Sequence, residues 1–273
     1  MRVLGYSLVL CLMVLSIRSL AFAQDQQAAA DPAQELAKKL SNPIASLVSF
    51  PIQFNYDSGY GSTDGSRLQI NVQPVIPVPL SEKWNLISRT IMPVISQSGM
   101  FPGSGSQFGI GDVTQSVFFS PSAPTKSGLI WGAGPVLLLP TATDDLLGGE
   151  KWGAGPTFVV LKQTGPKTVG LLMNHVWSFA GDDDRADISA TFIQPFYSYT
   201  TKTATTFGLN TEASYNWKTE DWSVPLNLTV SQLTRFAKQP VSVSAGIRYW
   251  LDSPDSGPEG FGLRLSVTYL FPK

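Results

Sequence analysis

"FGLRLSVTYLF", residues 261–271, is the stretch that decides the fold of this chain. Apolar and aromatic side chains occupy every second position, and Gly, Arg, Ser and Thr occupy positions between them. A period of two is that of a β-strand, and this polarity is typical of a strand with one face in lipid and one in a polar interior. The segment ends on an aromatic residue just before the C-terminus, as outer-membrane barrel strands generally do. It therefore predicts the last strand of a transmembrane barrel.

The same alternation begins at Val48 and recurs along the chain. It is clear at 50–57, 67–73, 207–216, 222–231 and 241–249, and weaker at 84–96, 110–120, 128–140, 152–163, 168–179 and 188–200. With residues 261–271 the total is twelve strands, an even number, as single-chain bacterial barrels have. We therefore predict an all-β fold, a transmembrane antiparallel up-and-down β-barrel of about twelve strands.

Connection lengths support this prediction, because periplasmic turns of such barrels are short and outer loops are longer. The expected turns are 79–83, 120–126, 164–167, 201–203 and 237–239. The expected outer loops are 58–66, 97–109, 141–151, 181–187, 218–221 and 252–260. The fifth outer loop is short, which weakens the rule without breaking it.

The N-terminal residues predict export. Residues 1–23 have the form of a signal peptide, with Arg2, an apolar stretch and the cleavage pattern Ala21-Phe22-Ala23. The following residues, 24–47, are expected to form a polar lead and a short periplasmic helix, and 48–273 the barrel. Pro32 after Asp31 favours a helix start, and Asn42-Pro43 a helix end. We favour an ordinary surface helix over a plug of the barrel.

The composition of this chain distinguishes it from soluble domains, from helical membrane proteins and from nucleic-acid-binding proteins. Charged residues make up 14% of the chain, against about 25% in soluble domains. Beyond the signal peptide no apolar run is long enough for a transmembrane helix. The chain has 19 basic and 20 acidic residues, and the signal peptide holds Arg2 and Arg18, so the mature net charge of −3 argues against nucleic acid as a partner.

The strands of a soluble β-sandwich or lipocalin-like barrel would also alternate between apolar and polar residues. The low charge of the polar face, the strand number and the aromatic residues near strand ends favour the membrane barrel instead. We therefore expect a location in the outer membrane of a Gram-negative bacterium. The expected partners are outer-membrane lipid and lipopolysaccharide, a small-molecule solute, and the barrel-assembly machinery, which would bind the C-terminal strand.

Charged residues on the polar face are the candidate functional residues. A charge facing lipid costs about 2–4 kcal/mol at the membrane midplane, so these side chains should face the lumen. Two interpretations stay open: an ion-pair network that fills the barrel, or a charged constriction that selects solutes. Inward-facing Ile87 and Val136 make the lumen mixed, which suits aromatic or amphipathic solutes. The candidates for the lumen and its selectivity are Arg67, Arg89, Asp112, Glu212, Arg235, Arg248 and Arg264.

No residue pattern predicts catalysis, a metal site or a cofactor. Cys11 leaves with the signal peptide, and the single His175 cannot build a multi-histidine metal site. A lipid hydrolase using His175 with Ser178 and Asn174 stays open as an alternative. Asp182-Asp183-Asp184 could bind a divalent ion, but a solvated loop is favoured. The repeated WGAGP at 131–135 and 152–156 is followed by strand-like residues, so its glycines indicate close packing rather than a phosphate site.

Short motifs follow one another in a recognisable order at 42–47, 50–53, 109–112, 134–135, 140–141, 177–181, 194–195, 224–226 and 270–272. In these motifs the chain resembles a family of proteobacterial outer-membrane transporters linked to the meta-cleavage pathway of phenol degradation. The resemblance implies a barrel and transport, and supplies no catalytic residues.

These observations lead to an outer-membrane channel or transporter that passes small solutes through a lumen with charged residues, and not to an enzyme. A structural or adhesive barrel with a filled interior is the first alternative, because twelve strands lie between barrels that their side chains fill and barrels with an open channel. The lipid hydrolase is the second.

Overall fold

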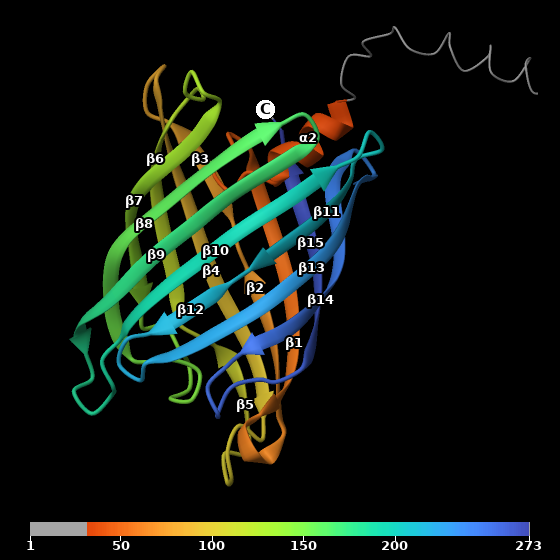
Figure 1. Cartoon of the computed structure of the whole chain (residues 1–273). Helices are drawn as coiled ribbons and strands as arrows, with labels where there is room; N and C mark the ends of the chain where they lie inside the picture. The colour runs from red at the N-terminus through yellow and green to blue at the C-terminus, as the bar shows by residue number, and fades with distance from the viewer. Residues whose placement is uncertain (1–31, 273) are drawn as a thin grey trace, which may run out of the picture. The chain divides into compact units, whose positions relative to one another are not determined.

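The alternating segments become the strands of one closed antiparallel barrel in a computed structural model that describes residues 32–272 (Figure 1). The signal peptide and most of the polar lead lie outside the described residues. The described chain begins with the helix α2 (Pro32–Leu40) and contains one short 3-10 turn, η1 (Gly61–Thr63). The strands are β1 (Val48–Tyr60), β2 (Gly65–Val72), β3 (Val75–Pro79), β4 (Trp84–Ser98), β5 (Ser106–Ile110), β6 (Val113–Pro121), β7 (Leu129–Leu139), β8 (Lys151–Thr164), β9 (Lys167–Gly181), β10 (Ser189–Thr200), β11 (Thr205–Thr211), β12 (Ala213–Asn216), β13 (Asp221–Phe236), β14 (Gln239–Asp252) and β15 (Phe261–Phe271).

The barrel has twelve strands, as the sequence predicts. Three of them are interrupted, so β2 continues as β3, β5 as β6, and β11 as β12. Each strand pairs with its neighbours in the chain, and β1 pairs with β15 from Val48↔Phe271 to Tyr56↔Leu263. This last pairing closes the sheet, so no strand edge is left unpaired there.

The connections divide the barrel into two ends. The turn end carries short connections such as 165–166 and 237–238, and the loop end carries longer ones such as 140–150 and 253–260. Two predicted loops, 58–66 and 97–109, are too long. The first is shortened because β1 extends to Tyr60 and β2 begins at Gly65, and the second because β4 extends to Ser98 and β5 begins at Ser106. These strand ends are polar and rich in glycine, so no apolar alternation marked them as strand. Both α2 and the end of β15 lie at the turn end (Figure 1).

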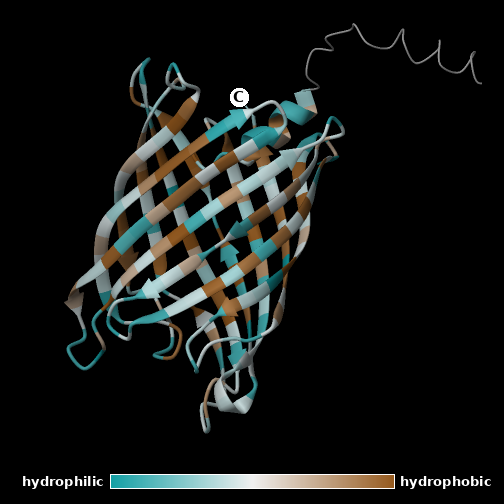
Figure 2. Ribbon diagram, viewed as in Figure 1, coloured by the Kyte–Doolittle hydropathy of each residue, from teal (hydrophilic) through white to brown (hydrophobic). Residues whose placement is uncertain are grey.

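The outer surface carries the apolar half of each alternating pattern (Figure 2). On β15 every second residue from Phe261 to Tyr269 has its side chain on the outside, and Leu263 and Leu265 are more than half exposed. Such a band is stable only against lipid. Aromatic side chains gather at both ends, with Trp84 against Trp131 at the turn end and Tyr215 against Trp217 and Trp222 at the loop end. The chain is thus built as an outer-membrane barrel.

The N-terminal segment differs from the expected surface helix. Gln163 Nε2 donates a hydrogen bond to the Lys38 carbonyl (3.0 Å), and Gln34 Nε2 donates to the Thr200 carbonyl (3.3 Å). After α2, Ile44 is buried in an apolar cluster inside the barrel, together with Ile87, Phe118, Val159, Leu161 and Leu172. The residues after the helix therefore enter the lumen, because the inward face of β4–β9 offers apolar side chains there. No helix within residues 32–272 is long and apolar enough to cross a membrane.

Candidate functional site in the barrel lumen

A buried ion pair joins β1 to β14 inside the barrel. Arg248 Nη1 donates to Asp57 Oδ2 at 2.9 Å, and Trp250 Nε1 donates to Asp57 Oδ1 at 3.0 Å. Less than a tenth of either charged side chain is exposed. The strand between them, β15, carries Gly262 at this level, and a Cβ there would overlap the Asp57 carboxylate. A glycine is therefore required for the two side chains to meet over β15.

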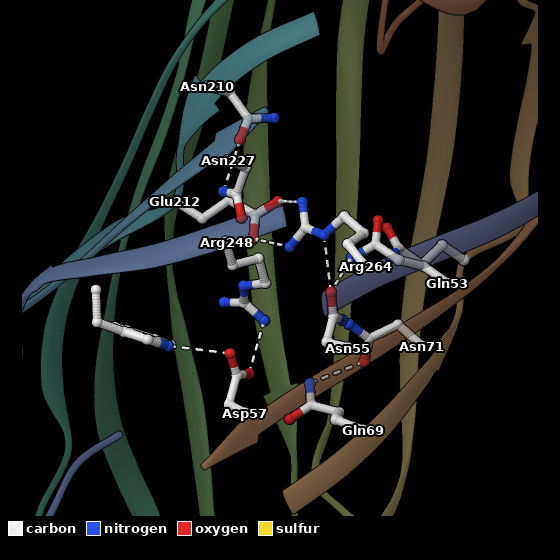
Figure 3. Close-up of polar contacts among 12 residues, drawn as sticks. Gln53, Asn55, Asp57, Gln69, Asn71, Asn210, Glu212, Asn227, Arg248 and Arg264 are labelled. Carbon is white, nitrogen blue, oxygen red and sulfur yellow. Dashed lines mark hydrogen bonds and ion pairs between the residues drawn. The ribbon is translucent and has the colours of Figure 1, made fainter. Parts of the chain in front are cut away.

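A second ion pair lies beside the first and extends to the junction of β11 and β12. Arg264 donates from Nη1 and Nη2 to the two carboxylate oxygens of Glu212, at 2.9 and 2.7 Å. Its Nε donates to Asn55 Oδ1 at 2.7 Å (Figure 3). A bidentate pair of this kind has a fixed geometry and satisfies most of the guanidinium. We call Asn55, Asp57, Glu212, Arg248 and Arg264 the waist of the lumen.

Amide side chains continue the polar wall beside the waist. Gln53 Nε2 donates to Asn55 Oδ1 at 3.3 Å, and Gln69 Nε2 donates to Asn71 Oδ1 at 2.9 Å. On the neighbouring wall Asn227 donates to Asn210 at 2.8 Å (Figure 3). These donors and acceptors make the inner surface of β1, β2, β11 and β13 wettable.

Of the seven sequence candidates, the structure brings Glu212, Arg248 and Arg264 together in the waist. Arg67 also faces the interior, but it contacts Gln97 (2.9 Å) and lies over the Tyr60 ring. Arg89 faces the interior and donates to Gln73 Oε1 at 3.2 Å. Neither arginine forms an ion pair with a described residue.

Two candidates lie away from the waist. The Asp112 carboxylate accepts hydrogen bonds from the backbone N–H groups of Ala142 (3.2 Å) and Gly149 (2.7 Å), so it fixes the loop 140–150. Arg235 has the inward parity of β13, but it lies close to the turn end and is exposed to solvent. Alternation shows which face of a strand a residue occupies, but not how near it lies to the middle of the barrel. For this reason the sequence did not show that Asp112 and Arg235 lie away from the waist.

The sequence candidates omit Asn55, Asp57 and Trp250. Asn55 and Asp57 share one face of β1, and Trp250 has the same parity as Arg248, which is among the candidates. The available signal was an inward face made of amides and charges alone, at Gln53, Asn55 and Asp57 of β1.

Between the waist and the N-terminal segment lies a cavity of about 330 Å³, which we call the chamber. Ser266 and Asn210 line it, each two residues from a charged residue of the waist, and Leu40 and Leu47 line it from the N-terminal segment. Its wall is rich in hydroxyl groups, from Ser41, Ser49, Ser198, Thr206, Thr229, Ser231, Ser242, Ser244, Ser266 and Thr268. The apolar cluster around Ile44 borders the chamber, and Val75 and Phe196 contact the cluster and also line the chamber.

Comparisons with known proteins bear on the fold. No family model and no curated protein matches the chain. Among solved structures, an outer membrane channel from Pseudomonas putida F1 aligns with a TM-score of 0.65 at 16% identity, over 83% of this chain and 96% of that one. This chain therefore has the fold of an outer-membrane barrel of that kind.

More distant barrels also align. The outer membrane phospholipase of Salmonella typhi gives a TM-score of 0.48 at 10% identity, over 90% of this chain and 99% of that one. The β domain of the Bordetella autotransporter BrkA gives 0.46 at 7% identity, over 83% of this chain and 100% of that one. Likenesses this distant support no argument about function.

His175 lies on the outer surface, as its parity predicts. Its Nδ1 is 2.7 Å from Thr191 Oγ1 and its Nε2 is 3.5 Å from Ser189 Oγ, while its ring lies 4.0 Å from that of Trp177. Ser178 instead donates to Asp187 Oδ1 at 3.2 Å. Hence the three residues of the hydrolase hypothesis form no shared hydrogen-bond chain.

The loop end near Ser178 carries its own charges. The hydrogen bond from Ser178, together with the ammonium groups of Lys218 and Lys151, holds the pKa of the Asp187 carboxyl below its ordinary value. The Asp182-Asp183-Asp184 stretch lies in the same loop, and within residues 32–272 no group of three or more acidic, His or Cys side chains could hold a metal ion.

Proposed function

We propose that this protein is an outer-membrane channel for small polar solutes and that the waist controls which solutes pass. The observation that carries the proposal is a chamber left unfilled beside a wall of buried charges and amides. Burying charge costs several kcal/mol per ion before pairing offsets it, and an apolar filling often serves stability equally well. This chain uses such a filling around Ile44, but it leaves the chamber beside that cluster open. A charged wall next to open space is what solute selection requires.

The comparisons and the sequence support the same function. The Pseudomonas putida protein with the same fold is named an outer membrane channel, and we extend that role to this chain. We also propose membership of the transporter family linked to phenol degradation, on the ordered motifs described above. The mixed lumen, with Phe196 and Leu233 lining the chamber among hydroxyl groups, suits solutes with both polar and apolar parts.

The test is conductance of the purified protein in planar lipid bilayers. We expect stepwise currents from the wild type. The variant Arg264→Gln should shift the reversal potential in a salt gradient toward cation preference, because Glu212 loses its partner and keeps its charge. Glu212→Gln should shift it the other way.

Arg235→Gln is the matched control, because it removes one positive charge outside the waist. Its reversal potential should equal that of the wild type. Absence of currents from a correctly folded wild type, together with absence of solute uptake into liposomes, would reject the channel and favour the structural barrel. Phospholipid turnover that disappears in His175→Ala would favour the hydrolase instead.

A further inference from the structure

We propose that the chamber is a binding site for a small organic anion, whose carboxylate pairs with the Arg89 guanidinium. This inference rests on the proposed channel function and names the class of solute. Its support comes from the charges, the unpaired donors and the size of the chamber.

The charges of the chamber have one sign. Lys39 and Arg89 are the charged side chains among its lining residues, and no Asp or Glu lines it. By contrast, Arg248 and Arg264 lie next to the chamber in the waist, where carboxylates already neutralise them. Glu212 lies near enough to interact with Arg89, but Arg264 already binds both of its oxygens. The three arginines Arg89, Arg248 and Arg264 thus face two carboxylates, which leaves one positive charge in excess beside the chamber.

The Arg89 guanidinium keeps most of its donors free. Gln73 Oε1 accepts one hydrogen bond from Nη2, and no described carboxylate forms an ion pair with Arg89. A guanidinium presents a planar set of N–H donors that matches the two oxygens of a carboxylate. Since a half-buried cation without an ion-pair partner is unfavourable, a carboxylate that enters the chamber would gain an ion pair and hydrogen bonds with Arg89.

A second polar group without a partner belongs to a residue that lines the same chamber. The Ser198 side chain is only 7% exposed, lines the chamber, and its hydroxyl has no hydrogen-bond partner among the described residues. Buried polar groups are nearly always paired, so such a hydroxyl indicates a missing partner. It lies on β10, whereas Arg89 lies on β4, so the unpaired groups come from separate parts of the wall.

Size and polarity narrow the ligand further. The volume of about 330 Å³ is at the small end of ligand cavities, which span about 300–1,000 Å³. Hydroxyl groups from β11, β13, β14 and β15 suit a hydroxylated ligand, and Val75, Phe196 and Leu233 suit an apolar part. A small carboxylate with hydroxyl or ring carbons fits these groups, and a phospholipid is too large.

The experiment is calorimetric titration of the detergent-solubilised, folded protein with two pairs of matched probes. Gluconate is compared with neutral sorbitol, and benzoate with neutral benzamide. In the wild type at least one anion should bind about tenfold or more tightly than its neutral partner, since a charge-assisted pair contributes that much.

The variants locate the binding. Arg89→Gln should remove the preference for the anion, Arg89→Lys should retain part of it, and Ser198→Ala should weaken binding severalfold. Arg235→Gln, an exposed arginine outside the chamber, should bind as the wild type does. Circular dichroism confirms that each variant is folded.

Two outcomes would overturn the proposal: equal binding of each anion and its neutral partner, or unchanged anion preference in folded Arg89→Gln. Bilayer recordings separate this result from the channel function. Anion binding without conductance would support the binding site and reject the channel function. Conductance without anion binding would reject the binding site alone.

Discussion

At the scale of single residues, glycines determine where strands and side chains approach closely. The two WGAGP motifs lie on the adjacent strands β7 and β8, where Gly134 pairs with Thr157 and Gly155 with Val136. A Cβ on Gly134 would overlap the Val117 carbonyl oxygen, and one on Gly155 would overlap that of His175. Gly262 has the same role in the waist. The packing interpretation of the repeat thus has a steric cause.

This steric cause predicts a difference between two alanine substitutions in one strand. Gly134→Ala should lower the free energy of unfolding by about 1–3 kcal/mol, because a rigid backbone carbonyl must move. Gly132→Ala should lower it much less, because its Cβ would meet its nearest atoms, in the Ile44 and Phe118 side chains, at 3.3 Å. Urea unfolding in lipid vesicles measures both, and equal losses would contradict the steric explanation.

At the scale of elements, the N-terminal segment is the part whose place the sequence did not show. Gln34 of helix α2 donates to the Thr200 carbonyl at the end of β10, and the Lys38 carbonyl of the helix accepts from Gln163 at the end of β8. Beyond the helix, Ile44 packs into the lumen. Asn42 Oδ1 accepts a hydrogen bond from the Ile44 backbone N–H (3.0 Å), which fixes the turn that leads inward. The segment therefore narrows the lumen at its turn end.

We expect Ile44→Asp to raise single-channel conductance. A carboxylate in the cluster of Ile87, Phe118 and Leu172 is unfavourable by several kcal/mol, so the segment should leave its position in the lumen. Ile44→Val, which removes one methylene and costs about 0.5–1.5 kcal/mol, is the control and should conduct as the wild type does. Identical conductance in all three folded proteins would show that the segment does not limit flow.

At the scale of the whole molecule, the barrel reverses the arrangement of a soluble protein. Leu263 and Leu265 lie on the outside, and the charged side chains of Asp57 and Arg248 lie within. The closed strand order makes this stable, since every strand has two neighbours and lipid covers the apolar face. The outer-membrane location follows from this arrangement.

The apolar outer surface predicts that the cost of placing a charge on it depends on the depth of that charge in the membrane. Leu265→Arg, near the middle of β15, should lower the free energy of unfolding by about 2–4 kcal/mol in a bilayer. Leu251→Arg, at the loop-end terminus of β14, should cost about 0–1 kcal/mol, because its charge reaches the headgroups. Both residues are more than half exposed in the wild type. Equal costs at the two positions would contradict the membrane placement.

The alternation in the sequence was enough to predict twelve strands and the two faces of each, although not the interruptions that separate β3, β5 and β12. An alternation of period two is a local property, so Arg248 and Arg264 could be assigned to the interior without knowledge of any partner. The parity of His175 placed it outside for the same reason. The elements with mixed parity or polar ends, such as the region 58–66, were the ones whose bounds differed.

Only the tertiary structure decided which inward residues meet. Arg264 pairs with Glu212 and Arg248 with Asp57 because strand register and the closing β1–β15 pairing place these side chains at the same level along the barrel axis. Register in turn depends on residues far apart in the chain. The same long-range packing left Arg89 facing the chamber without a carboxylate and drew Ile44 into the lumen.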